Sequence, residues 1–249
     1  MIRAIDHLVI LVEDLDAASA DYTALGFTVT LGGTHADGAT HNALVVFADD
    51  SYLELIAFRH EAPEHHWWRH VAAGEGLIDF ALLPTAIAED VAAAQSRGLE
   101  MYGPYAGGRL RPDGLRVAWQ NARSSTFDLP FLCGDVTPRE LRVPQGDLRT
   151  HANGVTGIAG VTVVANDLWA SVARYQALLG SDAAGPAFAL GAATITLIAP
   201  IPGTSEQDPL RERLSRHGEG PFALTLRGAR ATSFDPALAH GVPIDLVAV

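Results

Sequence analysis

Two side chains that can bind a metal or move a proton lie in apolar segments near the start of the chain. His7 lies within residues 5–12 and Glu54 within residues 51–58, and both segments have the composition of buried strands. A buried imidazole or carboxylate costs free energy unless it has a partner. We therefore expect His7 and Glu54 to share one site. The alternatives are a core histidine bonded to a neighbouring carbonyl and a glutamate on the solvent side of its strand.

A second set of residues has the chemistry of substrate recognition. Arg109 and Arg111 flank a short turn-forming stretch, 112–114, and Trp119 follows it. Arginine forks match the geometry of carboxylates and phosphates, and Pro-Asp-Gly is typical of a tight turn. We expect these three residues to bind an anionic part of a ligand, and the alternative is a solvated hairpin. Asn42 could donate to a substrate oxygen or cap a strand, and we expect His35 to be a solvated loop residue.

A repeated order of elements must position these residues. Strand, helix and three strands follow one another from His7 to Phe58, with Asp14 or Asp16 as the helix N-cap and Gly26 after the helix. The same β-α-β-β-β order recurs from residue 77, with strands at 79–83, 99–102, 115–121 and 125–132. It recurs again from residue 157, and a shortened copy begins at residue 221.

These repeats predict an α+β fold of four βαβββ modules, the last one truncated, that form curved mixed sheets. We expect residues 1–135 to hold two modules. Residues 136–154 are rich in proline, glycine and charge and are expected to be a linker. Residues 155–249 are expected to form a degenerate second half of two modules.

Composition narrows the classes of partner and compartment. The 249 residues are 48% hydrophobic, and the net charge is −12. The sequence contains no cluster of Lys and Arg that could bind phosphates, so we expect no nucleic-acid partner. No apolar run reaches the length of a membrane span, so we expect no membrane partner. Cys133 is the single cysteine and no signal peptide is evident, which favours the cytoplasm.

Several short segments carry motifs of a known family, and these are 5–9, 26–27, 32–35, 38–42, 52–56 and 108–114, followed by Trp119. In these segments the chain resembles the vicinal oxygen chelate superfamily and, within it, the glyoxalase-like domain group of the glyoxalase, bleomycin-resistance and dioxygenase type. The specific resemblance covers roughly residues 4–135, and the second half resembles the superfamily in its repeat pattern alone.

The resemblance implies that the curved mixed sheets form a cup-shaped site, that the active cup lies in residues 1–135, and that it holds a divalent metal ion. It implies His7 and Glu54 as metal ligands of the first module, with Glu54 also a possible general base, and His41 as a third ligand or proton shuttle. In the second module Phe80 falls at the place of His7, and Asp128 falls at the place of Glu54 and could coordinate. In the third module Gly160 and Thr196 fall there, so no metal is expected.

The function that the resemblance favours is a metal-dependent lyase, isomerase or dioxygenase acting on a small oxygenated organic molecule. Histidine with a carboxylate suits Fe, Mn, Zn, Ni or Co and does not choose among them. The rival function is metal-free binding or sequestration of a small molecule, which Phe80 and the tryptophans favour. A homodimer is expected because dimers are common in folds of this kind.

Overall fold

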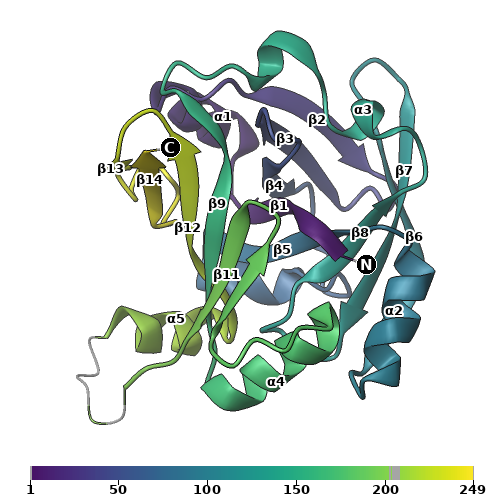
Figure 1. The fold of residues 1–249 in the computed structure, drawn as a ribbon. Helices are drawn as coiled ribbons and strands as arrows, with labels where there is room; N and C mark the ends of the chain where they lie inside the picture. The colour runs from purple at the N-terminus through teal and green to yellow at the C-terminus, as the bar shows by residue number, and fades with distance from the viewer. Residues whose placement is uncertain (1, 202, 204–207, 249) are drawn as a thin grey trace.

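The computed structural model describes residues 2–201, 203 and 208–248, and these residues form two β-sheets with helices packed around them (Figure 1). The elements of the first half are β1 (Ile2–Leu11), α1 (Leu15–Ala24), β2 (Thr30–His35), β3 (Thr40–Val46), β4 (Tyr52–Phe58), η1 (Trp68–Ala73), β5 (Gly76–Pro84), α2 (Ile87–Ser96), β6 (Met101–Leu110), β7 (Arg116–Ser124) and β8 (Phe131–Asp135). The remaining elements are α3 (Arg139–Arg142), η2 (Gly146–Arg149), β9 (Val155–Val164), α4 (Leu168–Leu179), β10 (Ala187–Leu190), β11 (Ala193–Ile198), α5 (Pro209–His217), β12 (Gly220–Gly228), β13 (Thr232–Ser233) and β14 (Ile244–Ala248).

The first eight strands close into a barrel in the order β1-β4-β3-β2-β6-β7-β8-β5. Each βαβββ module supplies four neighbouring strands, and the two modules meet where β1 pairs with β5 and β2 pairs with β6. In each module the first and last strands run parallel. The helix after the first strand returns the chain to the end of the sheet at which that strand began, and the next three strands then alternate in direction. The barrel confirms the predicted α+β class and the paired modules.

The same local chemistry begins the first helix of each half. The carboxylate of Asp14 accepts hydrogen bonds from the backbone N–H groups of residues 16 and 17, and Asp167 does the same for residues 169 and 170. These bonds satisfy N–H groups that have no partner inside the helix. The repeated N-caps explain why the repeat is visible in the sequence.

The second half forms a six-stranded sheet in the order β10-β11-β9-β12-β14-β13. The pairs β9/β11 and β12/β14 are parallel, as β1/β4 is, and the last copy is shortened as predicted. This sheet packs against the outside of the barrel (Figure 1), and one hydrophobic core contains Leu8 and Leu53 of the barrel together with Ile195 and Leu226 of the sheet.

The position of the last barrel strand differs from the prediction. Residues 125–130 form a bend and loop, and strand β8 begins only at Phe131. Pro130, which has no backbone N–H to give to a ladder, stands directly before it. Asp128 therefore lies in a loop and not on the strand equivalent to β4, so its predicted alignment with Glu54 is wrong.

Strand register identifies which residues occupy the matching positions of the second module. His7 is opposite Tyr52 in the β1/β4 ladder, and Ala81 is opposite Phe131 in the β5/β8 ladder. Glu54 lies two residues after Tyr52, and Cys133 lies two residues after Phe131. Ala81, and not Phe80, therefore takes the place of His7, because Phe80 points outward into the core between the halves.

The segment predicted to be a linker packs into one end of the barrel. It contains the short helix α3 and the turn η2, and Val143 is buried against Leu44, Val46 and Tyr52 of the barrel wall. The guanidinium of Arg142 is fully buried there. The joining segment is thus part of the barrel's core.

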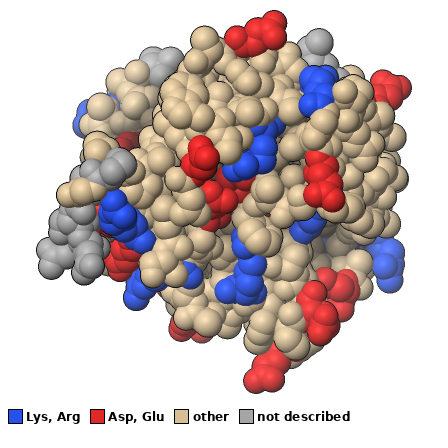
Figure 2. Space-filling view, turned by 90° about the horizontal axis from the view of Figure 1, so that it is seen from below, with Lys and Arg blue, Asp and Glu red and all other residues tan. Residues whose placement is uncertain are grey.

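On the face shown in Figure 2, acidic and basic side chains lie interspersed among neutral ones. None of the helices in the described ranges combines the length and the apolar composition that crossing a bilayer requires.

Candidate active site

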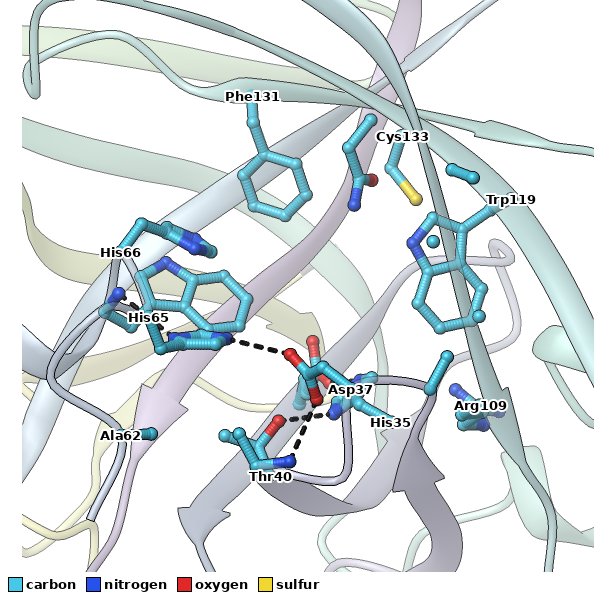
Figure 3. Close-up of a pocket in the computed structure, with 18 of the residues that line it drawn as sticks. His35, Asp37, Thr40, Ala62, His65, His66, Arg109, Trp119, Phe131 and Cys133 are labelled. Carbon is cyan, nitrogen blue, oxygen red and sulfur yellow. Dashed lines mark hydrogen bonds and ion pairs between the residues drawn. The ribbon is translucent and has the colours of Figure 1, made fainter.

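A cavity of about 600 Å³ opens into the barrel interior, and the strands of both modules line it (Figure 3). The first module contributes His7, His35 and Glu54 to its wall, and the second contributes Arg109 and Trp119. These side chains come from β1, β2, β4, β6 and β7. Along each strand of a barrel, every second side chain faces the interior, so side chains that are distant in sequence meet there.

Glu54 lies at the centre of the polar contacts in this cavity. Its Oε2 is 3.4 Å from Nε2 of His7, and its Oε1 is 3.3 Å from Nε2 of His35. The side-chain amide of Asn42 donates to Oε1 at 2.6 Å. Burial opposes ionisation of Glu54, but the hydrogen bond and charge of His35, with smaller contributions from His7 and Asn42, lower its pKa to about 2. The predicted pairing of His7 with Glu54 is present, and Asn42 contacts the carboxylate.

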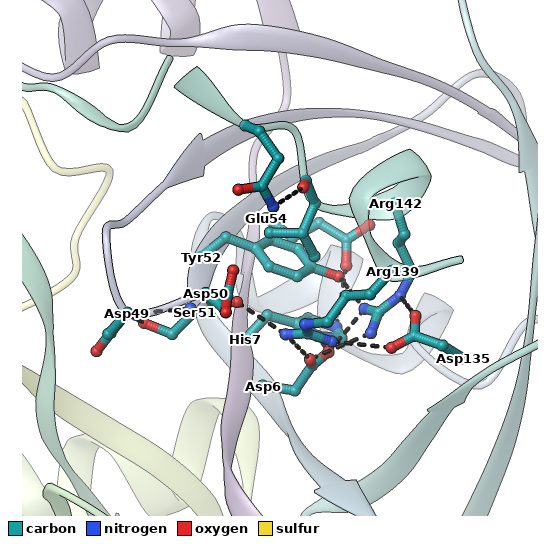
Figure 4. Close-up of polar contacts among 12 residues, drawn as sticks. Asp6, His7, Asp49, Asp50, Ser51, Tyr52, Glu54, Asp135, Arg139 and Arg142 are labelled. Atoms are coloured by element: carbon teal, nitrogen blue, oxygen red, sulfur yellow. Dashed lines mark hydrogen bonds and ion pairs between the residues drawn. The ribbon is translucent and has the colours of Figure 1, made fainter. Parts of the chain in front are cut away.

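His7 is held in place from behind its ring (Figure 4). Its Nδ1 lies 2.6 Å from Oδ2 of Asp6, and its ring stacks on Tyr52 with ring centroids 4.5 Å apart. Burial alone would raise the pKa of Asp6, but Arg142, His7 and Arg139 outweigh it and hold that pKa well below its usual range. The bond to Asp6 fixes the orientation of the ring, so Nε2 is the nitrogen of His7 that faces the cavity and Glu54.

His35 belongs to the site, although the sequence predicted a solvated loop residue. It is the last residue of β2, its Nδ1 is hydrogen-bonded to Oγ1 of Thr40 at 2.8 Å, and its ring meets Trp119 edge-on. The signal for an inward position was hidden because the preceding Gly32 and Gly33 interrupt the hydrophobic alternation of the strand.

His41 does not join this cluster. Along β3 the side chains of Thr40 and Asn42 face the barrel interior, and His41 between them points to the other side. The charged groups that act on His41 are Arg59 and the acidic residues at the start of α1, together with His35. The expectation that His41 converges with His7 and Glu54 is therefore wrong. Asn42, the next residue of β3, faces the barrel interior and bonds to Glu54, so the side chain of His41 must lie on the opposite face of the strand.

Asp128 also lies outside the cavity. It lies in the loop 125–130, and its side chain is fully buried against helix α4. There it accepts hydrogen bonds from Ser171 at 2.5 Å and from Nε of Arg174 at 2.9 Å. Arg174 also forms an ion pair with it at 2.8 Å. These bonds tie Asp128 to the second half of the protein, so its predicted role as a metal ligand does not fit its position.

The three residues predicted to recognise substrate separate into two groups. Arg109 and Trp119 line the cavity, and Arg109 donates to the backbone carbonyl of Arg142 at 2.7 Å. Arg111 lies on the hairpin outside the cavity, where it pairs with Asp113 at 2.8 Å and donates to the carbonyl of Leu141 at 3.1 Å. The predicted turn is present, since the N–H of Gly114 donates to the carbonyl of Arg111.

Further cavity residues were missed by the sequence analysis. They are Asn121, Arg123, Phe131 and Cys133, and the cavity wall beside them also includes Trp67. Trp119, Asn121 and Arg123 occupy alternate positions of β7, and this period of two was the available signal. Cys133 stands where Glu54 stands in the first module, and burial raises the pKa of its thiol.

The donor atoms of the first module have the chemistry of metal ligands, but as they stand they do not surround one point. In the described ranges, no group of three or more His, Cys, Asp or Glu side chains is arranged to hold a metal ion. The reason is visible in the contacts, because the two imidazoles face different oxygens of Glu54.

A closed barrel of two βαβββ modules, with histidine and glutamate from the first and last strands of one module facing its cavity, defines a protein of the vicinal oxygen chelate type. The chain belongs to the glyoxalase-like domain family, whose model matches residues 5–179. A search of curated proteins found no relative of this sequence.

Solved structures share the fold at low sequence identity. A hypothetical protein from Staphylococcus aureus is 14% identical with a TM-score of 0.74, and the match covers 98% of this chain and 99% of that one. A mutant of 4-hydroxymandelate synthase from Streptomyces coelicolor is 18% identical with a TM-score of 0.64, over 92% of this chain and 72% of that one. A xylose isomerase-like TIM barrel/4-hydroxyphenylpyruvate dioxygenase fusion protein is 14% identical with a TM-score of 0.56, over 92% and 37%.

Proposed function

We propose that this protein is a divalent-metal-dependent enzyme that acts on a small oxygenated organic molecule, with His7, His35 and Glu54 as the metal ligands. One observation carries the proposal. Both imidazoles have Nδ1 bonded to a neighbouring side chain, Asp6 or Thr40, and both present Nε2 to the carboxylate of Glu54. Outer-sphere partners of this kind orient the histidines of metal sites.

Taken one pair at a time, the contacts of Glu54 with the two imidazoles also have the spacing of metal ligands, and a small rotation of the carboxylate would be needed to bring all three residues to one ion. Two ligands bonded to one ion at about 2.0–2.2 Å lie about 2.8–3.6 Å apart at octahedral or tetrahedral angles. The separations of 3.4 Å and 3.3 Å between the imidazole nitrogens and the Glu54 oxygens lie within this range. Carboxylates bind metals in the ionised form, and the surroundings of Glu54 lower its pKa and so favour that form.

The donor set favours oxidation over proton transfer as the reaction. Two histidines and one carboxylate with open positions are the ligands of non-haem iron oxygenases. A Glu54 that coordinates the metal would not be free to take a proton from the substrate, so the lyase and isomerase alternatives would need a different general base. Two solved structures of similar fold carry the names of a 4-hydroxymandelate synthase and a 4-hydroxyphenylpyruvate dioxygenase fusion.

The metal, when bound, would act as a Lewis acid on the substrate's oxygens. The chain's own residues would hold and shield the substrate. Trp119 and Phe131 give the cavity apolar walls, and Arg109 is a buried cation within electrostatic range of Glu54. Water is excluded on the side of the joining segment, where Val143 and Arg142 fill the end of the barrel.

A metal-free binding protein is the second candidate. It is favoured by the second module, where Ala81 and Cys133 stand at the positions equivalent to His7 and Glu54. That half of the cavity therefore lacks a histidine and a carboxylate that could bind a metal together. In that case the ion pairs of Glu54 with His7 and His35 would serve to stabilise the barrel.

Elemental mass spectrometry of protein purified without chelator or tag metal tests the proposal. We expect about one equivalent of a divalent transition metal per chain. His7→Ala, His35→Ala and Glu54→Gln should each remove it. His41→Ala is the matched control, because it removes an imidazole of the same module that lies outside the cavity, and it should retain the metal.

Two results would overturn the metal-dependent function. Wild-type protein that contains no metal and takes none up on titration would leave the binding-protein function. Equal loss of metal in His41→Ala and His35→Ala would show that the proposed ligand set is wrong.

A further inference from the structure

We propose that the cavity has a second, anion-binding end built around Arg123, so that its ligand is a small organic carboxylate whose charged group lies away from the metal ligands. This inference rests on the proposed function for the reactive end of the molecule. It adds a substrate class and a residue that determines specificity.

Arg123 faces the cavity from β7 with its guanidinium uncommitted. It follows Trp119 and Asn121 on the inward side of that strand, and all three line the cavity. Throughout the described residues, its side chain makes no hydrogen bond and no ion pair, and its one specific contact is a cation–π approach of 5.9 Å to Phe131. Arginines at functional sites are suited to forked recognition of carboxylates.

The acidic side chain that acts on Arg123 is hydrogen-bonded to other groups. Asp79 is close enough to influence Arg123, but its Oδ2 accepts from Nε1 of Trp67 at 2.9 Å and its Oδ1 accepts from the backbone N–H of Phe80 at 2.8 Å. Burial lowers the pKa of Arg123, and Asp79 and Tyr105 only partly offset this effect. A guanidinium in this position is stabilised when an anion enters the cavity.

The two arginines of the cavity serve different ends. Arg109 interacts electrostatically with Tyr52 and Glu54, and its Nη2 is bonded to the carbonyl of Arg142. Arg123 instead interacts with Asp79 and Tyr105 and with the cavity histidines His65 and His66. Trp119 meets the ring of His35, which contacts Glu54, and Arg123 lies four residues farther along β7, about 13 Å at about 3.3 Å per residue. The guanidinium of Arg123 therefore lies towards the end of the cavity away from Glu54.

One aromatic ring connects the two ends. Phe131 meets the ring of His7 edge-on at 5.4 Å and that of Trp67 at 6.1 Å, and Arg123 lies 5.9 Å from its centroid. A planar or short apolar body laid along Phe131 would reach from His7 to Arg123. Asn121, between Trp119 and Arg123 on the inward side, has a buried Oδ1 without a hydrogen-bond partner, which adds a polar group beside this path.

Binding of matched acids and amides tests the inference. The probes are phenylacetate, 3-phenylpropanoate and 4-phenylbutanoate, each compared with its primary amide by calorimetric titration of the full chain. At least one acid should bind about tenfold or more tightly than its amide, as expected for a charge-assisted hydrogen bond. Arg123→Gln should abolish this preference, and Arg123→Lys should keep part of it. Arg111→Gln, the control outside the cavity, should keep all of it.

Three results would overturn the inference: equal binding of acids and amides by the wild type, a preference unchanged in Arg123→Gln, or no binding of any acid at millimolar concentration. Glu54→Gln separates this result from the proposed function. It should lose the metal and keep the preference for acids, so absence of metal and absence of anion binding are independent outcomes. Thermal melting of Arg123→Gln and Arg123→Lys checks that both variants are folded.

Discussion

Arg142 holds Asp6 across 136 residues of sequence. Its Nη1 lies 2.7 Å from Oδ2 of Asp6 and its Nη2 lies 3.1 Å from Oδ1, so the pair is bidentate. The same Oδ2 is the partner of Nδ1 of His7 at 2.6 Å. The segment that joins the two halves therefore helps to set the orientation of a cavity imidazole.

Replacing Arg142 by Met should destabilise the protein strongly. The change leaves Asp6 buried with Arg139 as its remaining cationic partner, at 2.7 Å, and also removes the bonds from Arg142 to Asp135 and Tyr52. Breaking a buried ion pair on one side costs about 3–5 kcal/mol. Urea denaturation followed by circular dichroism measures the loss. Arg111→Met, which breaks an exposed pair with Asp113, should stay within about 0.5 kcal/mol of wild type. Equal effects of the two changes would refute the structural role of Arg142.

Asp6→Asn should weaken metal binding while leaving every proposed ligand in place. The amide can still accept a hydrogen bond from His7, but it lacks the charge of the carboxylate. Loss of an outer-sphere carboxylate typically costs about 10–100-fold in metal affinity. Competition against a chromogenic chelator measures the affinity, and Asp113→Asn, on the exposed hairpin, serves as the control. Unchanged affinity in Asp6→Asn would show that Asp6 has a structural role alone.

The sequence was informative where a polar residue interrupted an apolar strand. His7 and Glu54 were identified in this way, and the structure brings their side chains within 3.4 Å. The module order was equally accessible, because Asp14 and Asp167 cap equivalent helices. These features are local, and periodicity and capping chemistry reveal them without knowledge of the tertiary fold.

The rest of the site depends on features that are not local. Strand β8 was misplaced because residues 125–132 alternate well enough to resemble a strand, and that error brought Asp128 into the expected ligand set. His35 is preceded by two glycines, whose missing side chains conceal the face on which it lies. Arg142 comes from a polar segment that looks like a linker, and only the closed barrel shows why a buried arginine is needed there.

Gly32→Ala should disturb the support of Glu54. A β-carbon at Gly32 would lie 2.1 Å from Oδ1 of Asn42, whose amide donates to Glu54. The amide must move, and overpacking of this kind costs about 1–3 kcal/mol. Gly185→Ala is the matched control, because a β-carbon there would meet no atom within 4 Å. Thermal melting compares the two variants, and an equal melting temperature would mean that Asn42 is free to move aside.

The contact between His70 and His217 should make stability sensitive to acid. The two rings stack with centroids 5.8 Å apart, and His70 is buried with neither ring nitrogen bonded to any described group. Burial, with Arg69, His217 and Arg213, lowers the pKa of His70 to about 3, and burial with Arg213, Arg216 and Arg69 lowers that of His217 to about 4. The fold thus favours the neutral form of both imidazoles.

The sign of the effect follows from the order in which the two states take up protons. Above about pH 6.5 both imidazoles are neutral whether the chain is folded or unfolded, and their contribution to stability is complete. As the pH falls towards 3, the unfolded chain is protonated first, so the free energy of unfolding decreases by at most about 1.4 kcal/mol for each unit of pKa difference.

Urea denaturation between pH 7 and pH 4 should show this decrease. His70→Phe should flatten it, because the variant has one fewer group to protonate on unfolding, whereas His60→Gln at an exposed position should leave it unchanged. If His70→Phe lost stability in acid as steeply as wild type, other groups would have to account for the whole effect.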